Sequence, residues 1–521
     1  MEDTAVSFSS GAEEITAMDA DPDKNIMAGG IFTNSIPGVS FSALGGADIM
    51  VQFLDRDRNQ NWTTPFRFRS SGGDDRLTDV EFNPVSNSYY ITGQLDGNLT
   101  ILSAQFGQGS FFLTEINQGG STPSVGWMFP SASGGINNSV SRGAGITTDP
   151  AGDIYVLGEF EDSIVLSPTL TLYDSEGDGD LFLAKFSGTG GTKGDLLQAI
   201  RIVSKGSVQG VDLGYDKVNN RVVIGANYKD TVIFSSTDTL FADSSGQSDF
   251  LVARYSNTLT YVNSTAAIHS KDDIVAYGFD VDTTGASVAT GYFEGSYTAG
   301  SFTENAQGGK DIFVIKVGNA GTVTWATNFG GSSDEGGRKV AIDTNSKIYI
   351  LGQFETTVNF GTVDTVINKG QQDGWLLTLD NAGAVLGAKG GIMQTGNDVL
   401  TPLAFALEGD TLWFGGDFFG IAKFGTRPAF SSRGFQKDAF IAQVEGPTVF
   451  CNVDTSLSIT DFRLNGSDLH VCDGDSGLMS TSVTGNVTFQ WFKDSKAIAG
   501  ATTTQLHVDS GEYITLSLPM W

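Results

Sequence analysis

Cysteine, histidine and basic residues are all scarce in this sequence. The chain of 521 residues contains two cysteines, Cys451 and Cys472, so its first 450 residues hold neither a disulfide framework nor a cysteine-based metal site. The three histidines, His269, His470 and His507, are scattered, and no His-Glu-x-x-His motif or histidine pair at ligand spacing occurs. Zinc sites of these familiar types are therefore excluded.

The scarcity of basic residues leaves the chain strongly acidic. There are 30 Lys and Arg against 60 Asp and Glu, a formal net charge of −30 and an isoelectric point near 4.2. Such a surface repels phosphate backbones and anionic lipids, so we expect neither nucleic-acid binding nor membrane-surface binding. No apolar run approaches the roughly 18 residues of a membrane span, and no signal peptide is visible at the N-terminus. A secreted protein would be represented here in mature or trimmed form.

What the chain does contain is glycine and apolar residues in a repeating order. Its 67 glycines and 17% charged residues favour turn-rich β structure. Seven glycines follow apolar segments at intervals of 61 to 67 residues: Gly30, Gly93, Gly158, Gly225, Gly291, Gly352 and Gly416. A second apolar segment opens with an aspartate in six copies and with serine in one: Asp48, Ser110, Asp180, Asp249, Asp311, Asp373 and Asp438. Two independent anchors thus give seven copies of one unit.

Each copy contains four short strand-like segments. In the sixth copy they lie at 338–343, 347–354, 373–379 and 384–390. Turns such as 149–153 and 282–285, rich in Asp and Gly, separate the first two segments, and no stretch shows sustained helical periodicity. We therefore predict an all-β fold, a seven-bladed β-propeller of four-stranded blades.

The two ends of the repeat region predict how the ring closes. The seventh copy reaches Glu445, Gly446 and Pro447 without a clear fourth strand, and residues 4–10 occupy the matching place before the first copy. We expect this N-terminal segment to be the outermost strand of blade seven, because an open ring would expose two strand edges. Deletion of residues 1–10 is then expected to lower the melting temperature by many degrees.

The segment 308–361, GGKDIFVIKVGNAGTVTWATNFGGSSDEGGRKVAIDTNSKIYILGQFETTVNFG, resembles the SBBP-type β-propeller repeats of secreted and surface bacterial proteins. The resemblance is strongest over 267–380 and extends over roughly 12–446. It implies the propeller architecture and a bacterial, extracellular source. That family has no single activity, so the resemblance implies no chemistry.

Residues 447–521 depart from the repeat. Trp491 within an apolar strand, Gly500 in a charged hairpin, and Tyr513 opening a late strand resemble bacterial immunoglobulin-like modules. A complete sandwich has about seven strands and roughly 100 residues, so we expect this module to be incomplete and the native chain to continue. In related modules the cysteine resembling Cys472 pairs with one in the missing strand. A bond between Cys451 and Cys472, which would imply an oxidising compartment, is the intrachain alternative.

The recurring aspartates admit two interpretations. They form either a ring of carboxylates that binds cations or local caps that accept backbone N–H groups at the strand entry. Because the residue recurs in almost every copy, whereas an active site seldom does, we favour the caps. The glycines are likewise interpreted as close-packing or bulge positions.

Two acidic loops alternate oxygen-bearing side chains as calcium loops do, at 174–180 and 19–25. In the first, Lys185 stands where a bidentate Glu is expected, and Asp180 already belongs to the repeat. In the second, Lys24 stands where the loop glycine belongs. Calcium stays open at both loops, and we assign no metal ligand, cofactor-binding residue or catalytic residue.

Enzymatic signatures are few. G-x-S-x-G, phosphate-binding and dinucleotide fingerprints are absent, as is the tryptophan of a sialidase Asp-box at 333–336. Paired carboxylates at the central channel could act as acid and base. A grafted site is expected in the longest departures from the repeat, 103–110 and 115–145.

The favoured function is a non-enzymatic, extracellular or cell-surface scaffold for adhesion or surface assembly. It joins a propeller (1–446) to an Ig-like spacer (447–521) and binds a protein or a glycan, without nucleic-acid binding or membrane insertion. Two alternatives remain: a polysaccharide-active hydrolase or lyase that uses the channel mouth, and a structural subunit of an extracellular filament.

Overall fold

The computed structural model divides the chain into two compact units, Met1–Gly446 and Pro447–Trp521. It describes residues 13–445 with short gaps and, after them, only seven strands. The gaps lie at 34, 37–40, 44–45, 58, 60–61, 63–64, 69–72, 97–99, 102–103, 106–109, 119–122, 130–139, 175–177, 244–246, 362–363, 369, 391–396, 410, 424–428 and 433–435.

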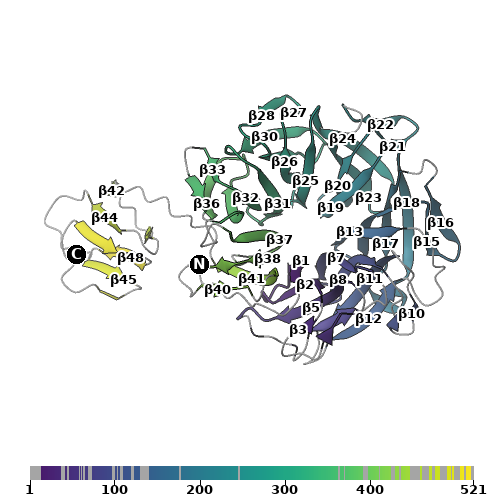
Figure 1. Cartoon of the computed structure of the whole chain (residues 1–521), viewed down its shortest axis with the longest axis horizontal. Coiled ribbons are helices and arrows are strands. Elements are labelled where there is room, and N and C mark those ends of the chain that lie inside the picture. The colour runs from purple at the N-terminus through teal and green to yellow at the C-terminus, as the bar shows by residue number, and fades with distance from the viewer. Residues whose placement is uncertain are drawn as a thin grey trace. The chain divides into compact units, whose positions relative to one another are not determined.

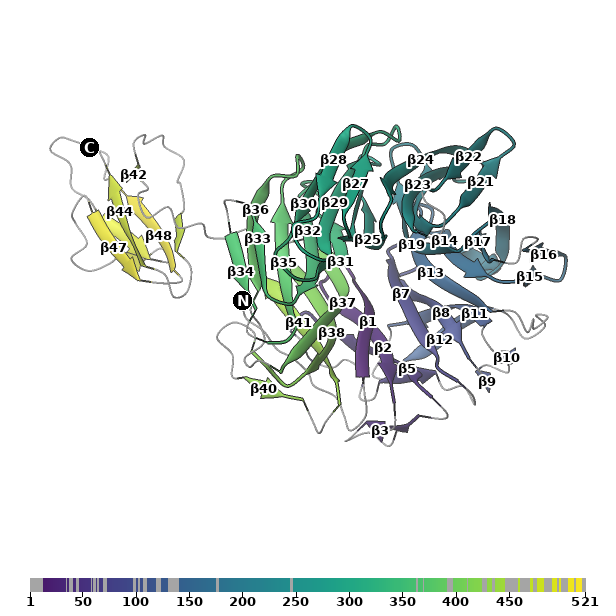
Figure 2. The same cartoon turned by 45° about the horizontal axis from the view of Figure 1, so that its top comes forward.

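The first unit is a ring of antiparallel sheets arranged around one axis (Figures 1 and 2). The innermost strands are β1 (Glu13–Ala20), β7 (Arg76–Asn83), β13 (Ser141–Thr148), β19 (Val208–Asp216), β25 (Ile274–Val281), β31 (Glu335–Ile342) and β37 (Val399–Glu408). The second strands are β2 (Ile26–Phe32), β8 (Ser88–Leu95), β14 (Ile154–Phe160), β20 (Arg221–Tyr228), β26 (Ser287–Phe293), β32 (Ile348–Phe354) and β38 (Thr411–Phe419). The described residues thus form seven blades, which confirms the predicted propeller.

Third and outermost strands complete the blades. The third strands are β5 (Asp48–Leu54), β11 (Ser110–Asn117), β17 (Asp180–Phe186), β23 (Asp249–Ser256), β29 (Asp311–Val317), β35 (Asp373–Leu379) and β41 (Asp438–Glu445). The outermost strands of blades one to six are β6 (Phe66–Phe68), β12 (Ser124–Phe129), β18 (Leu196–Ser204), β24 (Tyr261–Ser270), β30 (Val323–Phe329) and β36 (Val385–Gly390). Blade seven has three strands among the described residues. Its expected fourth strand, at residues 4–10, lies outside them.

The ring closes between blades seven and one through described residues. Strand β1 contacts β37 on one side and β7 on the other. The backbone N–H of Glu13 donates to the carbonyl of Lys437 at 3.1 Å. Trp413 and Ile441 of blade seven share a buried apolar cluster with Ile15 and Met18 of blade one. The contact between first and last blades therefore does not depend on the N-terminal segment alone.

Each blade also carries a two-stranded hairpin between its second and third strands, which the repeat pattern in the sequence did not predict. These hairpins are β3–β4 (Ser35–Ile36, Phe41–Ser42), β9–β10 (Thr100–Ile101, Ala104–Gln105), β15–β16 (Ser163–Ser167, Leu170–Tyr173), β21–β22 (Thr231–Ser235, Asp238–Phe241), β27–β28 (Ser296–Ala299, Phe302–Asn305), β33–β34 (Thr357–Phe360, Asp364–Ile367) and β39–β40 (Ile421–Ala422, Phe430–Ser431). Strand β21 pairs with β18 of the preceding blade, and β27 pairs with β24. The hairpins thus fasten neighbouring blades together.

A β-bulge recurs in all seven innermost strands, opposite or beside the repeated glycine. In blade six the pairing shifts between Gly337 and Lys339, which leaves Arg338 as the extra residue, and Gly337 pairs with Gly352. A Cβ on Gly352 would lie 2.1 Å from the Trp375 ring and 2.4 Å from the Gly336 carbonyl. The predicted role of the glycine as a bulge and close-packing residue is confirmed. The first strand of this copy begins at Glu335, three residues before the predicted start at 338, because the bulge interrupts the period of two.

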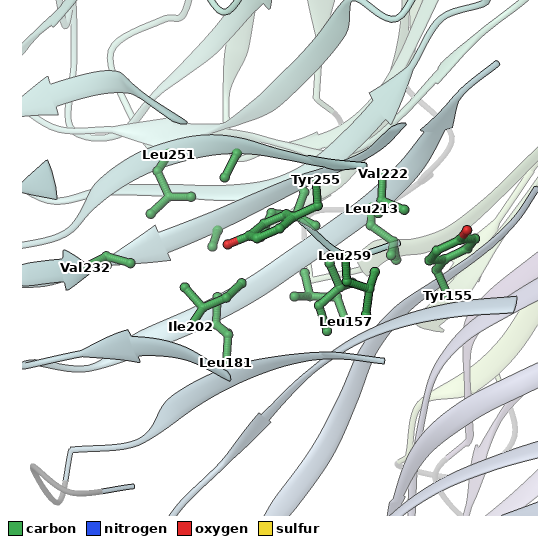
Figure 3. Close-up of a cluster of buried hydrophobic side chains, with 14 of the residues drawn as sticks. Tyr155, Leu157, Leu181, Ile202, Leu213, Val222, Val232, Leu251, Tyr255 and Leu259 are labelled. Atoms are coloured by element: carbon green, nitrogen blue, oxygen red, sulfur yellow. The ribbon is translucent and has the colours of Figure 1, made fainter. Parts of the chain in front are cut away.

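The apolar core lies between blades as separate clusters. In the one shown in Figure 3, Leu157 and Leu181 of blade three pack against Leu213, Val222 and residues of β23 in blade four. Third strands such as β17 and β29 bury nearly every residue, because both of their faces are covered by neighbouring blades. This explains why they read as continuous apolar runs in the sequence.

The second unit contains seven described strands in two sheets. One has the order β42 (Ser458–Ile459), β44 (Ser476–Thr481), β47 (Gln505–Asp509), and the other β43 (Leu469–Val471), β48 (Glu512–Ser517), β45 (Gln490–Lys493), β46 (Lys496–Ala497). Cys451 and Cys472 lie outside the described residues. The described chain is all-β apart from one short 3₁₀ turn, η1 (Gly190–Thr192). Within it no helix has the length and apolar character needed to cross a membrane.

Candidate binding face

One face of the propeller collects the starts of the innermost and third strands and the ends of the second strands. In blade six these are Glu335, Asp373 and Phe354, which pair across the sheet. The two-stranded hairpins leave the blades at the same end, so we call this the hairpin face. Two cavities open on it, one between blades five and six and one across blades two to four.

The blade five–six cavity has a volume of about 140 Å³. Aromatic rings, planar polar groups and charges of both signs line it. Its lining residues are Tyr277, Tyr292, Lys310, Asp334, Glu335, Gly336, Arg338, Gln353, Phe354, Glu355 and Gln372. The cavity therefore offers ring surfaces beside hydrogen-bonding groups that can both donate and accept.

Contacts among the lining residues fix their positions. The Arg338 guanidinium lies 4.4 Å from the Tyr277 ring centre, and the Lys310 ammonium lies 4.4 Å from the Tyr292 ring centre. The two rings are 5.9 Å apart at 40°. Arg338 Nε also donates to Gln353 Oε1 at 3.0 Å. Because Arg338 and Tyr277 are the bulge residues of neighbouring blades, the repeat itself brings them together.

Glu335 is a buried acid in the wall of this cavity. Its residue is 2% exposed, its Oε2 accepts the Gly331 N–H at 2.9 Å, and its buried Oε1 has no hydrogen-bond partner in the protein. Burial, with the nearby charge of Asp311, raises the pKa of Glu335 to about 7. Near neutral pH this buried carboxyl is therefore present in both its protonated and its ionised form.

The blade two–four cavity is larger, about 340 Å³, and more polar. Arg142 donates from Nη2 to both carboxylate oxygens of Glu159, at 3.1 and 3.0 Å, and Glu159 also accepts the Gly210 N–H at 2.9 Å. Its other lining residues are Arg76, Gln94, Val140, Ser141, Phe160, Glu161, Asp178, Gly179, Asp180, Ser207, Val208 and Gln209. Among the described residues of the predicted insertion 115–145, those at its end reach this cavity, namely Val140, Ser141 and Arg142. Residues 119–122 and 130–139 lie outside the described residues, as do 103 and 106–109 of the other insertion.

Five carboxylates on the innermost strands group around the propeller axis: Asp19, Asp79, Glu81, Asp212 and Asp280. We call them the axial carboxylates. Paired acids at the channel could act as acid and base, but the sequence pattern alone does not identify which acids lie there. Four of them join neighbouring blades. Asp19 accepts the Phe82 N–H, Asp79 the Ile146 N–H and Asp280 the Ile342 N–H, each at 2.7 Å, and Glu81 accepts the Thr148 N–H at 3.2 Å. They are partners of backbone groups as well as charges.

Burial raises the pKa of every axial carboxylate. The pKa of Asp19 and of Asp280 rises to about 7, and that of Asp79 to about 6, against the attraction of Lys339. Glu81 and Asp212 shift in the same direction, because burial is reinforced by the charges of Asp19 and Asp79 respectively. Asp19, Asp79 and Asp280 therefore exchange protons near neutral pH.

Three of the recurring third-strand aspartates accept backbone N–H groups; the donor is local, as predicted, at Asp311, but lies in the outermost strand at Asp180 and Asp249. Asp180 and Asp249 accept the backbone N–H of Ser204 and Ser270 at 2.7 and 2.9 Å, and Asp311 accepts that of Gln307 at 2.6 Å. They open the third strand of each blade, away from the axis, rather than forming a carboxylate ring around it.

The two acidic loops considered for calcium are held by the protein's own groups. Asp180 forms an ion pair with Arg201, which also lies 3.8 Å from Asp174; residues 175–177 lie outside the described residues. Asp21 accepts the backbone N–H groups of Asp23 and Asn25, at 2.9 and 3.0 Å, while Asp19 turns to blade two. Within the described residues, each loop directs its carboxylates to protein donors.

Comparison with known proteins identifies no family for this chain. No family model and no curated protein matches the chain. Solved structures similar to it include a virginiamycin B lyase from Staphylococcus aureus (8% identity, 84% of this chain and 98% of that chain, TM-score 0.38) and an ulvan lyase (9%, 79% and 93%, TM-score 0.38). A fungal alcohol oxidase is similar at 12% identity over 99% and 92%, with TM-score 0.38. At these values the likeness supports no inference about activity.

Proposed function

We propose that this chain is a non-enzymatic binding scaffold of an extracellular or cell-surface protein, and that its propeller binds a glycan through the blade five–six cavity. The observation that carries the proposal is the fixed group of Tyr277, Tyr292, Arg338 and Gln353 in that cavity. Sugars present C–H faces that pack on aromatic rings and hydroxyls that need both donors and acceptors. Preorganised side chains lower the entropy lost on binding.

The small size of the blade five–six cavity favours one unit of a polymer over a whole small molecule. Pockets that enclose a small ligand usually have volumes of about 300–1,000 Å³. At about 140 Å³, the blade five–six cavity has room for one sugar unit or side group. The rest of the chain would then lie across the hairpin face, where the blade two–four cavity, about 340 Å³, offers a second subsite.

The proposal that the protein works outside the cell or at its surface rests on the acidity of the chain and on its second compact unit. A net charge of −30 keeps a surface soluble and disfavours anionic polymers. Seven strands in two sheets suit the Ig-like spacer that the sequence resembles, and spacers of this kind carry binding domains away from a surface.

A glycan array followed by calorimetry tests the proposal. Wild-type protein is screened on the array, and the selected glycan is titrated into wild type, Tyr292→Ala and Arg338→Met. The affinity of each variant for the glycan is expected to fall by at least about tenfold, the loss typical of a residue central to an interface. Tyr173→Ala, which removes a 64% exposed ring outside both cavities, is the control and should bind within about twofold. Equal affinity in all four proteins would refute the proposed site.

The axial carboxylates favour one second candidate, a polysaccharide hydrolase or lyase. Acids with a pKa of about 6 or 7, such as Asp79 and Asp280, suit proton transfer at neutral pH. Reducing-end and unsaturated-product assays on the array-selected glycan separate the two functions. Binding without products supports the scaffold, whereas turnover abolished by Asp79→Asn supports the enzyme.

A further inference from the structure

The outer part of blade four brings an imidazole between two carboxylates. His269 Nδ1 of β24 lies 3.3 Å from Asp243 Oδ1, after β22, and 3.3 Å from Asp249 Oδ2 at the start of β23. All three ligand atoms lie within 4.8 Å of one another. Among the described residues this is the one grouping of His, Cys, Asp or Glu side chains with such a geometry.

We propose that His269, Asp243 and Asp249 bind a divalent transition-metal ion of the zinc class. Bonds of about 2.0–2.1 Å to nitrogen and oxygen at tetrahedral angles place ligand atoms about 3.3–3.4 Å apart. Both distances from His269 Nδ1 match this separation, and at Asp249 Oδ2 the imidazole also forms a hydrogen bond that a metal ion would replace. An imidazole ligand selects zinc-class ions over calcium, which takes oxygen ligands.

Backbone hydrogen bonds position the ligands. Asp249 is 1% exposed, its Oδ1 accepts the Ser270 N–H at 2.9 Å, and its Oδ2 accepts the Asp243 N–H at 3.0 Å. The Asp243 side chain is 47% exposed, so water can reach the site and supply the remaining ligand. Such outer contacts are typical of metal sites, in which neighbouring groups orient the ligands.

Blade three supplies an internal comparison. Asp174 and Asp180 have the same spacing in the sequence as Asp243 and Asp249. The Ser204 N–H donates to Asp180 as the Ser270 N–H donates to Asp249. In blade three, however, the cation between the two acids is the guanidinium of Arg201, which cannot bind a metal. In blade four the side chain between the two acids is instead the imidazole of His269, one residue before Ser270, whereas Arg201 lies three residues before Ser204. An imidazole, unlike a guanidinium, can bind a metal ion.

Zinc titration of the full chain tests the proposal. Zn²⁺ alone is added to wild type, His269→Arg, Asp243→Asn and Asp174→Asn, with calorimetry as the readout. Wild type and the blade-three control Asp174→Asn are expected to bind the same number of ions. His269→Arg, which replaces the imidazole with a side chain that cannot bind a metal, is expected to bind one ion fewer, and Asp243→Asn to bind that ion at least tenfold more weakly.

NMR of the wild-type protein gives a second readout of the same site. In wild type labelled at its three histidines, zinc should shift the imidazole NMR signals of His269, assigned by their loss in His269→Arg. Unshifted His269 signals, or equal zinc stoichiometry in wild type and His269→Arg, would overturn the proposal. Because Asp243 is exposed, Asp243→Asn tests the same site with little risk to the fold.

Discussion

Single residues in this propeller carry constraints that repeat with the blades. The glycine of each second strand exists because the bulge of the innermost strand occupies the space where a Cβ would lie. In blade five, a Cβ on Gly291 would be 1.9 Å from the Val275 carbonyl, a backbone atom that cannot move aside. The bulge in turn sets which side chains reach the hairpin face, so one small residue positions Tyr277 and Arg338.

Gly352→Ala should therefore destabilise the propeller by about 2–4 kcal/mol, since overpacking against backbone and the Trp375 ring forces the strands apart. Gly336→Ala, in the partner strand, is the control. Its Cβ would meet its nearest neighbour, the Tyr292 Cβ, at 3.6 Å, an ordinary contact. Chemical denaturation measures both. Similar midpoints for the two variants would show that the space at Gly352 is not restrictive.

At the scale of strands, neighbouring blades are joined by acids that accept backbone N–H groups. Asp280 in β25 accepts the Ile342 N–H of β31 at 2.7 Å and the Val281 N–H at 2.6 Å. The pKa of Asp280 is raised to about 7 in the folded state, against an ordinary value near 3.8. The folded chain therefore holds this proton more tightly than the unfolded chain does, and the contribution of Asp280 to stability falls as the pH rises between those values.

Asp280→Ala tests this linkage. At pH 5 the variant should lose about 1–3 kcal/mol, because the Ile342 N–H loses its partner. The difference from wild type should shrink as the pH rises towards 8, since ionised Asp280 no longer favours the folded state. Melting temperatures of both proteins at several pH values give the result, with the exposed Asp23→Ala as control. A difference that grows with pH contradicts the raised pKa.

The strands and their order could be predicted from the sequence, whereas the site could not. Glycine, aspartate and apolar segments recur in every copy because each blade solves the same packing problem, and the caps at Asp180, Asp249 and Asp311 follow from that recurrence. Tyr277 and Arg338, by contrast, are each found in a single copy of the repeat, so no recurrence marks them. Their meeting depends on the bulge register, which the four-segment pattern did not contain. With that register known, both fall at the same position of neighbouring blades.

The His269 site escaped prediction for a similar reason. Its ligands come from a strand start, the residue after a hairpin and an outermost strand, so no short motif joins them. The hairpins were missed because their strands are short and interrupt the apolar pattern, as in β27, whose residues alternate between buried and exposed.

At the scale of the whole molecule, closure couples the first blade to the last. Trp413 of blade seven is fully buried in the cluster that includes Ile15 and Met18 of blade one. This apolar contact, with the hydrogen bond from Glu13 to Lys437, makes the seam a continuation of the core. A propeller of this kind leaves only short strand edges for pairing with other chains.

Trp413→Ala should accordingly lower the stability of the entire propeller by about 3–5 kcal/mol, the usual effect of a large cavity in a core. Hydrogen exchange should show faster exchange in blade four as well as in blades one and seven. Trp413→Phe, which keeps much of the ring volume, should lose less than half as much. Faster exchange confined to blades one and seven would mean that closure does not couple the ring.

Mapping of a bound glycan on the full chain tests the proposed function most directly. Hydrogen exchange is compared with and without the array-selected polysaccharide, while the solution is analysed for cleavage products. The account predicts slower exchange at 307–310 and 331–336, around the blade five–six cavity, with the polysaccharide intact. Protection confined to other blades, or release of shortened products, would contradict it.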